Sequence, residues 1–212
     1  MITLYDYLPS QNAWKVRLLL NQLEQEYTQQ FISIFEGEGR TDEYRAINPT
    51  GAVPAITLPD GSVLAESNTL LVYLAHGSQF LPSEPLQQAQ VQQWLFFESD
   101  YVQSTVATLR HWVMTGKDKY RSAEMLETKH QGSLNTLNVL DRRLSGNEFL
   151  APTGYSIADM SVYAYVHLAD EAGVPLEKFE NVQRWINSVK AQPRYLDEVY
   201  PYSIDKHSYK EL

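Results

Sequence analysis

The chain has 212 residues and a formal net charge of −9 at pH 7. That length can bury a sizeable core in one large domain or two small ones, and the acidic balance argues against a nucleic acid or an anionic membrane as partner. The sequence contains no cysteine, which excludes disulfides and thiolate metal sites, so any thiol chemistry must use a thiol from outside. The first residues lack a basic segment followed by an apolar run, and no apolar stretch reaches membrane-spanning length, so we expect a cytoplasmic protein.

Residues 1–78 show strand and helix signals in alternation. Alternating apolar and polar residues predict strands, and apolar residues that repeat at helical spacing predict helices. The predicted strands lie near 2–4, 31–34, 55–58 and 62–65, and the predicted helices near 16–23 and 69–75. The last two strands flank Pro59-Asp60-Gly61, which is a strong hairpin signal. The order βαβ, loop, ββα predicts a thioredoxin-like α/β domain over residues 1–78.

The second half of the chain is predicted to be helical. Residues 79–87 are expected to form a linker, because Pro82 and Pro85 interrupt the pattern there. Helices are predicted at about 87–115, 123–144, 157–169 and 182–191. The chain after the linker, residues 88–212, is therefore expected to be an all-α domain.

The predicted helix 87–115 carries two stripes of residues. One is apolar and is expected to face the core: Val91, Leu95, Val102, Val106, Leu109 and Val113. The other mixes aromatic and polar side chains, as the lining of a ligand pocket often does: Trp94, Glu98, Tyr101, Thr105, Thr108 and Trp112. A dimer contact or an ordinary half-buried surface explains the second stripe equally well.

Val53-Pro54 and the pair Glu66-Ser67 predict a binding site for a short peptide. An X-Pro bond reaches the cis state at a cost of only about 0.5–1 kcal/mol, and a cis bond would turn the Val53 N–H and C=O outward, toward a ligand backbone. Glu66-Ser67 stands at the start of an apolar helix, where unpaired N–H groups attract a carboxylate and the Glu side chain can pair with an ammonium. A γ-glutamyl group carries both charges.

Ser10 and Asn12 lie where the first strand passes into the first helix. Taken alone, both residue types suit a helix N-cap. With the peptide site downstream, we interpret them as thiol-activating groups, because a hydroxyl or amide donor and the helix dipole both favour a thiolate. Such sites lower a thiol pKa from about 8.5 by one unit or more.

Other motifs have ordinary structural explanations. Gly154–Ala158 is similar to the nucleophile elbow of hydrolases, but it lacks the final glycine and no strand precedes it. Ser156 and Asp159 instead predict a capping box at the start of a helix. The five histidines show no metal-ligand spacing, and no glycine-rich phosphate loop is present, so we expect neither a metal nor a nucleotide cofactor.

Three motifs, found in order along the chain, together resemble those of the cytosolic glutathione transferase family: Asn48-Pro-x-Gly-x-Val-Pro54, Glu66-Ser-Asn-x-Leu-x-x-Tyr-Leu74 and Ser156-x-Ala-Asp159. The segments 9–17, 37–41, 93–98 and 110–112 are similar to a bacterial theta- or nu-like subgroup. The resemblance covers nearly the whole chain. It implies a thioredoxin-like domain that carries glutathione as co-substrate, an all-helical domain that supplies the pocket for a small hydrophobic electrophile, and a homodimer active in detoxification.

The resemblance also implies roles for individual residues. The glutathione-binding residues would be Ala52, Val53, Pro54, Glu66, Ser67 and Arg40; the catalytic residues Ser10 and Asn12; and the electrophile pocket Tyr101, Thr105, Thr108 and Trp112. For thiol activation the ranking is Ser10, then Asn12, then Tyr5 near the end of the first strand.

Two departures from the family pattern bear on function. Ala13 stands where many bacterial relatives have Cys, which excludes a cysteine-dependent mechanism at that position. Ala52 stands where a longer polar residue often helps to hold the glycyl carboxylate; Arg40 or Lys15 are the candidates to replace it. The predicted activity is conjugation of glutathione to small electrophiles. Glutathione-dependent disulfide reduction and a non-catalytic scaffold role are the two alternatives.

Overall fold

The computed structural model describes residues 1–211. They form two compact units. The first combines Met1–His76 with the C-terminal segment that begins at Pro193, and the second is Gly77–Gln192. Within the described residues, no helix is both long enough and apolar enough to cross a membrane.

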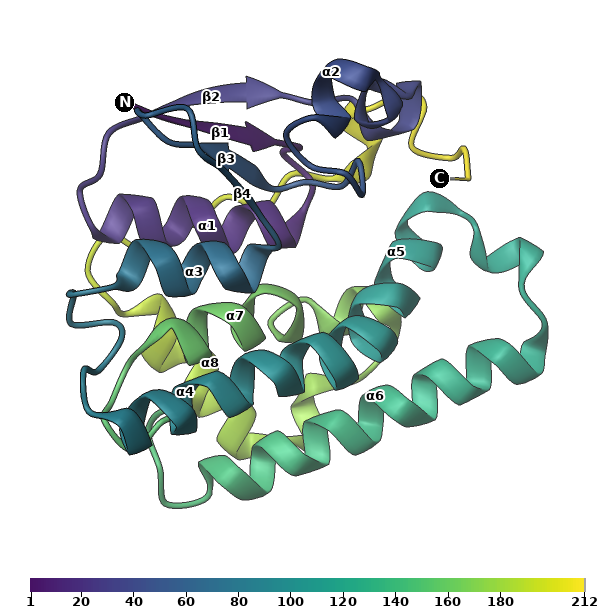
Figure 1. Cartoon of the computed structure of the whole chain (residues 1–212). Helices are drawn as coiled ribbons and strands as arrows, with labels where there is room; N and C mark the ends of the chain where they lie inside the picture. The colour runs from purple at the N-terminus through teal and green to yellow at the C-terminus, as the bar shows by residue number, and fades with distance from the viewer. Residues whose placement is uncertain (212) are drawn as a thin grey trace. The chain divides into compact units, whose positions relative to one another are not determined.

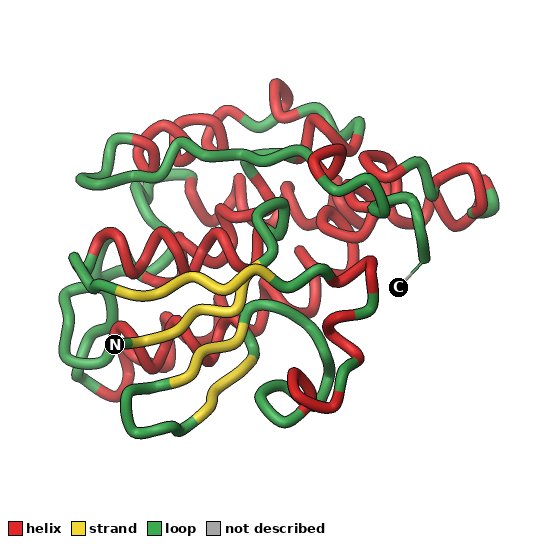
Figure 2. The backbone as a smooth tube through the Cα atoms, turned by 90° about the horizontal axis from the view of Figure 1, so that it is seen from above, coloured by secondary structure: helices red, strands yellow, loops and turns green. Residues whose placement is uncertain are grey.

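A mixed four-stranded sheet forms the centre of the first unit, with the order β2-β1-β3-β4. The strands are β1 (Ile2–Asp6), β2 (Tyr27–Phe31), β3 (Ala55–Thr57) and β4 (Val63–Ala65). β1 pairs in parallel with β2 and antiparallel with β3, and β3 pairs antiparallel with β4 (Figure 2). Helices α1 (Gln11–Gln22) and α3 (Ser67–Ala75) lie side by side along one face of this sheet, and the short α2 (Asp42–Arg45) lies at its end (Figure 1). This arrangement confirms the predicted thioredoxin-like domain.

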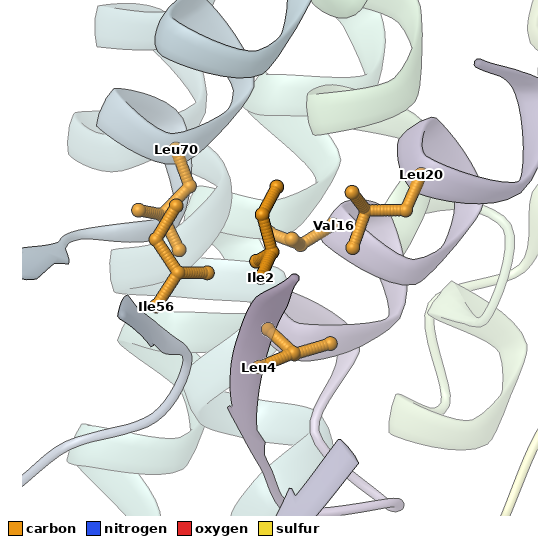
Figure 3. Packing of buried hydrophobic residues seen from close by; sticks show 6 residues of the cluster. All are labelled: Ile2, Leu4, Val16, Leu20, Ile56 and Leu70. Carbon is orange, nitrogen blue, oxygen red and sulfur yellow. The ribbon is translucent and has the colours of Figure 1, made fainter. Parts of the chain in front are cut away.

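The core of the first unit follows from the alternation of β1. Successive side chains of a strand point to opposite faces, so Leu4 and Tyr5 enter different clusters. Figure 3 shows the cluster between the sheet and the helices: Ile2, Leu4, Val16, Leu20, Ile56 and Leu70. Burial of each such aliphatic side chain contributes about 1.5–3 kcal/mol. The packing holds the starts of α1 and α3 on one rigid support.

The position predicted for the second strand was wrong. The apolar run 31–34 suggested a strand there, whereas β2 ends at Phe31 and four of its five residues are exposed. β2 is an edge strand, so it has little apolar signal of its own. The apolar residues after it serve another purpose: Ile32 is buried beside Tyr5, and Ile34–Glu36 forms the short 3-10 turn η1.

The second unit is helical, as predicted. Its helical segments are α4 (Pro85–Phe97), the π-helix η3 (Glu98–Ala107), α5 (Thr108–Thr115), α6 (Ala123–Leu144), α7 (Ile157–Val166) and α8 (Glu180–Lys190), with 3-10 turns η4 (Asp118–Tyr120), η5 (Ala169–Ala172) and η6 (Leu176–Lys178). All ten residues of α7 are buried, so α7 is the central helix of this unit. The predicted capping box is present at its start: Ser156 accepts from the backbone inside the helix, and Asp159 accepts from the Ser156 N–H.

The helix expected over 87–115 is continuous but is not an α-helix throughout. Its ten central residues, η3, have π-helical winding. Ser104 and Thr105 donate their hydroxyls to backbone carbonyls one turn back, and Thr108 donates to the Gln103 carbonyl at 2.8 Å. Such bonds loosen the α-helical ladder. Residues spaced for an α-helix therefore no longer share one face, and Val113, which was expected in the core, is 40% exposed.

Candidate functional site

The Val53-Pro54 bond is cis, as the sequence predicted. The loop before it is held by side chains: the carbonyl of Ala52 accepts from Asn48 Nδ2 at 2.7 Å and from the Tyr44 hydroxyl at 2.7 Å. Asn48 is only 2% exposed, so its amide is a fixed anchor. Two hydrogen bonds to one carbonyl fix the direction in which the chain enters the cis bond.

Val53 lies just outside the sheet. The pairing of β1 with β3 ends at Tyr5 and Ala55. Within residues 1–211, no backbone hydrogen bond engages the Val53 N–H or C=O. A backbone donor and acceptor in this state can pair with an added extended strand, which is how several domains bind peptides.

A second loop meets this one through two glycines. A Cβ atom on Gly51 would lie 2.2 Å from the carbonyl oxygen of Gly39, and a Cβ on Gly39 would lie equally close to the Gly51 carbonyl. Only glycine permits this approach of two backbones. The contact places the exposed residue Arg40 in a loop that touches the one leading to Val53.

The start of α3 has no cap from its own side chains. Glu66 is the N-cap residue, with φ 68° and ψ 111°, and its side chain makes no capping hydrogen bond. A residue other than glycine in such a conformation costs about 1–3 kcal/mol, and residues of this kind cluster at functional sites. The strained residue and the open helix N-terminus occur together, at the two positions expected to hold a γ-glutamyl group.

The start of α1 brings the predicted thiol-activating residues to the same place. Ser67 Oγ lies 3.4 Å from Asn12 Oδ1, which joins the first turn of α3 to the first turn of α1. Ser10 is the N-cap of α1, and its oxygen accepts from the Ala13 N–H at 3.3 Å. Because the Ser10 oxygen is the acceptor in that bond, its hydroxyl proton is available for a ligand atom.

Buried charges support these two helix starts. Arg17 pairs with Asp6 at 2.7 Å in the interior, and its other nitrogen donates to the Leu8 carbonyl at 3.2 Å. The hydrogen bond from Arg17 to the Leu8 carbonyl holds the loop that leads to Ser10. Lys15 Nζ donates to Asn68 Oδ1 at 2.9 Å, so this lysine links α1 to α3.

Tyr5, the third candidate for thiol activation, is nine-tenths buried within the sheet. It packs with Ile32, Tyr44 and Ala55, and its hydroxyl accepts from Thr57 Oγ1 at 3.4 Å. Its hydroxyl is therefore engaged with β3.

Tyr7 is a residue that the sequence analysis missed. It is fully buried between β1 and the loop to Ser10, and its ring centroid lies 5.8 Å from that of Phe35. Burial first, and the nearby Asp205 carboxylate second, raise the pKa of the Tyr7 phenol well above its usual range. Tyr7 therefore stays a neutral phenol. Local patterning gives no sign of this environment, because its partners lie far away in the sequence.

The four residues expected to line an electrophile pocket have separate neighbours within the second unit. Tyr101 is 55% exposed and contacts the ring of Phe97. Thr105 Oγ1 lies 3.4 Å from that of Thr136, on α6. Thr108 bonds to the preceding helical turn, and the Trp112 ring lies under the guanidinium of Arg121 at 4.9 Å. These contacts do not test the pocket assignment, which stays a prediction.

Within residues 1–211, no group of three or more His, Cys, Asp or Glu side chains is arranged to hold a metal ion. The polar side chains shown to meet are those of Ser67 and Asn12, and Ser10 stands two residues before Asn12 at the N-cap of α1. A hydroxyl, an amide and an unpaired backbone N–H and C=O are groups that can hydrogen-bond a carboxylate or a peptide backbone.

Both halves of the chain match known family models. Residues 9–76 match the model described as glutathione S-transferase, N-terminal domain, and residues 105–193 match glutathione S-transferase, C-terminal domain. A crystal structure of a glutathione S-transferase from Pseudomonas fluorescens Pf-5 is 37% identical, covers 92% of this chain and 97% of its own, and superposes with a TM-score of 0.89.

Two further relatives are more distant. A glutathione transferase structure from Pseudomonas putida, with one glutathione disulfide bound per subunit, is 27% identical, covers 91% of this chain and 88% of its own, and has a TM-score of 0.80. The disulfide-bond oxidoreductase YfcG of Escherichia coli is 26% identical over 200 residues, which is 91% of this chain and 92% of that protein.

Proposed function

Because this chain belongs to the glutathione S-transferase family, we propose that it binds glutathione at the start of α1 and α3 and activates the thiol for attack on small electrophiles. The proposal is supported by the contact between the starts of α1 and α3 and by the Val53 N–H and C=O, which have no backbone partner within residues 1–211. Ser67 is linked to the first turn of α1 through Asn12.

In this proposal the tripeptide lies extended along the loop of the cis bond. Its cysteinyl backbone pairs with the Val53 N–H and C=O. Its γ-glutamyl carboxylate accepts from Ser67 and the open N-terminus of α3, and its ammonium pairs with Glu66. Arg40, in the loop that touches Gly51, would meet the glycyl carboxylate in place of the residue absent at Ala52.

The chemistry follows from the donor at Ser10. A hydroxyl that donates to sulfur stabilises the thiolate relative to the thiol, so the thiol proton leaves to solvent at a lower pH. The thiolate then forms a carbon–sulfur bond, and the leaving group departs with its electron pair. Proximity of the two reactants supplies the rest of the rate. The helical unit would supply the electrophile pocket in a homodimer, and the theta- or nu-like subgroup belongs to this proposal as well.

The test combines a calorimetric titration with the ultraviolet absorbance of the bound thiolate, followed against pH. We expect wild type to bind glutathione in the millimolar range or below and to hold its thiol at a lowered pKa. In Ser10→Ala the pKa of the bound thiol should rise by about one unit, equivalent to about 1.4 kcal/mol, with affinity nearly unchanged. Absence of binding in wild type would refute the proposal.

Ser122→Ala is a matched control for the cap. Ser122 is the N-cap of α6, and its oxygen accepts from the Met125 N–H at 3.2 Å, as Ser10 does for α1. Both substitutions should lower the free energy of unfolding by about 0.5–2 kcal/mol. Only Ser10→Ala should move the thiol pKa. An equal pKa in the two variants would exclude Ser10 as the donor.

A second candidate function is glutathione-dependent reduction of disulfides. Two relatives favour it: YfcG is a disulfide-bond oxidoreductase, and the Pseudomonas putida structure holds glutathione disulfide. In that reaction the bound thiolate attacks one sulfur of the disulfide and the other sulfur leaves as a thiolate. Asn12 would be the main donor. Turnover of a small disulfide that is lost in Asn12→Ala but kept in Ser10→Ala, with little conjugation of aryl halides or enals, would favour this reaction.

A further inference from the structure

The C-terminal segment, residues 193–211, belongs to the thioredoxin-like unit. At their start, Asn21 Nδ2 donates to the Arg194 carbonyl at 2.7 Å and Gln22 Nε2 donates to the Pro193 carbonyl at 3.1 Å. The ring of Tyr195 lies 6.0 Å from that of Trp14. From there the segment runs to the far end of the sheet, near α2 (Figure 1). It is therefore held along α1 and is part of this unit.

At the far end the segment forms the 3-10 turn η7 (Tyr202–Ile204), which places Tyr202 in an aromatic cluster. Tyr202 is only 6% exposed, and its ring centroid lies 6.5 Å from that of Tyr7. Phe35 completes the cluster, and Val53 packs against it. The residue that is expected to bind the ligand backbone thus packs against a cluster to which the other end of the sequence contributes a side chain.

Neighbouring residues fasten the turn. Asp205 Oδ1 accepts from the His207 N–H at 2.8 Å, and His207 Nε2 lies 2.7 Å from Glu36 Oε1. Glu36 belongs to η1, directly after Phe35. The segment is therefore attached on both sides of Tyr202, and these attachments hold Tyr202 in the cluster.

The cluster that contains Tyr202 joins three segments next to the proposed site. Tyr7 begins the loop to Ser10, Phe35 precedes the loop with Arg40, and Val53 precedes β3. None of the three is held by the ladder of the sheet. We propose that Tyr202 is a positioning residue, which sets the Val53 backbone at the distance that a glutathione backbone requires. This inference rests on the function proposed above.

The test measures the dissociation constants of glutathione and of S-methylglutathione, at a temperature well below the unfolding transition of each variant. Tyr202→Ala should weaken both ligands by about ten-fold or more, equivalent to about 1.4 kcal/mol, because a shifted clamp affects every ligand with that backbone. Tyr202→Phe keeps the ring and should bind as wild type. Tyr209→Ala, at a tyrosine that is 64% exposed in the same segment, should also bind as wild type.

A role limited to stability would give a different result: a lower melting temperature with unchanged dissociation constants in the folded protein. Dissociation constants within two-fold of wild type in Tyr202→Ala would overturn the proposal. If that variant does not fold, Tyr202→Leu takes its place under the same criterion. If wild type itself binds neither ligand, the proposed function fails and this inference fails with it. If wild type binds and Tyr202→Ala binds within two-fold of wild type, only the inference fails.

Discussion

Helices α3 and α7 begin in opposite ways. At the start of α7, the Ser156 hydroxyl and the Asp159 carboxylate close the first turn in a complete capping box. At the start of α3, Glu66 makes no capping bond and takes a strained positive φ. The first four N–H groups of any helix need partners. At the start of α7 side chains supply such partners, whereas at the start of α3 the N-cap side chain supplies none.

The two helix starts also differ in burial and in the number of hydrogen bonds. Asp159 is fully buried and accepts from Leu150 N at 2.9 Å, from Ser156 N at 3.0 Å and from Trp185 Nε1 at 2.9 Å. Its carboxylate therefore anchors a loop, a helix start and α8. Among residues 1–211, the Ser67 hydroxyl has one side-chain hydrogen bond, to Asn12 at 3.4 Å. If the start of α3 binds glutathione as proposed, substitutions at the two helix starts should change different quantities: stability at α7 and affinity at α3.

The largest effect is expected for Asp159→Ala. Three buried donors, on Leu150, Ser156 and Trp185, would lose their acceptor. Because each unsatisfied buried donor costs about 1–3 kcal/mol, the free energy of unfolding should fall by about 3–5 kcal/mol. Urea denaturation at neutral pH measures it. A loss below about 1 kcal/mol would show that the loop and α8 are held by other contacts.

The pH dependence of stability should carry the next largest effect. Burial raises the pKa of Asp159 from 3.8 to about 6. The folded state then binds the proton more tightly than the unfolded state, so the contribution to stability is complete below the unfolded pKa and is lost as pH rises through about 6. The size is about 3 kcal/mol, from about 1.4 kcal/mol for each pKa unit.

Asp159→Asn removes the titration of Asp159 and leaves every other titratable group in place. The difference in unfolding free energy between wild type and Asp159→Asn therefore reports the titration of Asp159 alone. His167, at the opposite end of α7, has a pKa lowered by burial to about 4, which acts in the opposite direction and cancels in that difference. Between about pH 4 and pH 7, the unfolding free energy of wild type should fall by about 3 kcal/mol relative to that of Asp159→Asn. A flat difference would mean that Asp159 keeps its ordinary pKa.

Ser67→Ala should weaken glutathione binding by about 1–3 kcal/mol through the loss of a charge-assisted hydrogen bond, with little change in stability. Ser156→Ala should have the opposite effect: it should lower the free energy of unfolding by about 0.5–2 kcal/mol and leave the affinity for glutathione unchanged. Calorimetric titration and urea denaturation of both variants give the two quantities. If Ser67→Ala destabilises as much as Ser156→Ala while binding normally, the distinction between the two helix starts is wrong.

The smallest effect is expected for Glu66→Gly. Glycine tolerates φ 68° without the steric cost that Glu66 pays. The entropy cost of glycine offsets part of the gain, so the free energy of unfolding should rise by only about 1 kcal/mol. Glutathione affinity should fall, because the carboxylate that pairs with the ammonium is removed. A thermal scan and a titration test both statements, and a loss of stability would show that the conformation is not strained.

The sequence alone determined every feature whose cause is local. The hairpin at Pro59–Gly61, the cis Val53-Pro54 bond and the Ser156–Asp159 capping box depend on residues within a few positions of one another, and all three are present. Helical periodicity located α6 to the residue, because its amphipathic pattern is long. Ser10, Asn12 and Ser67 were also selected from sequence, since each stands at a helix start, and their roles stay predictions.

Tertiary structure decided the features that join distant parts of the chain. The mostly exposed edge strand β2 has no pattern of its own, and the π-helical winding of η3 alters the faces that α-helical spacing predicts. Tyr7 and Tyr202 lie near opposite ends of the sequence, and only the fold brings their rings to 6.5 Å. Burial against a distant partner depends on the packing of the whole unit, and local residue patterns carry no information about it.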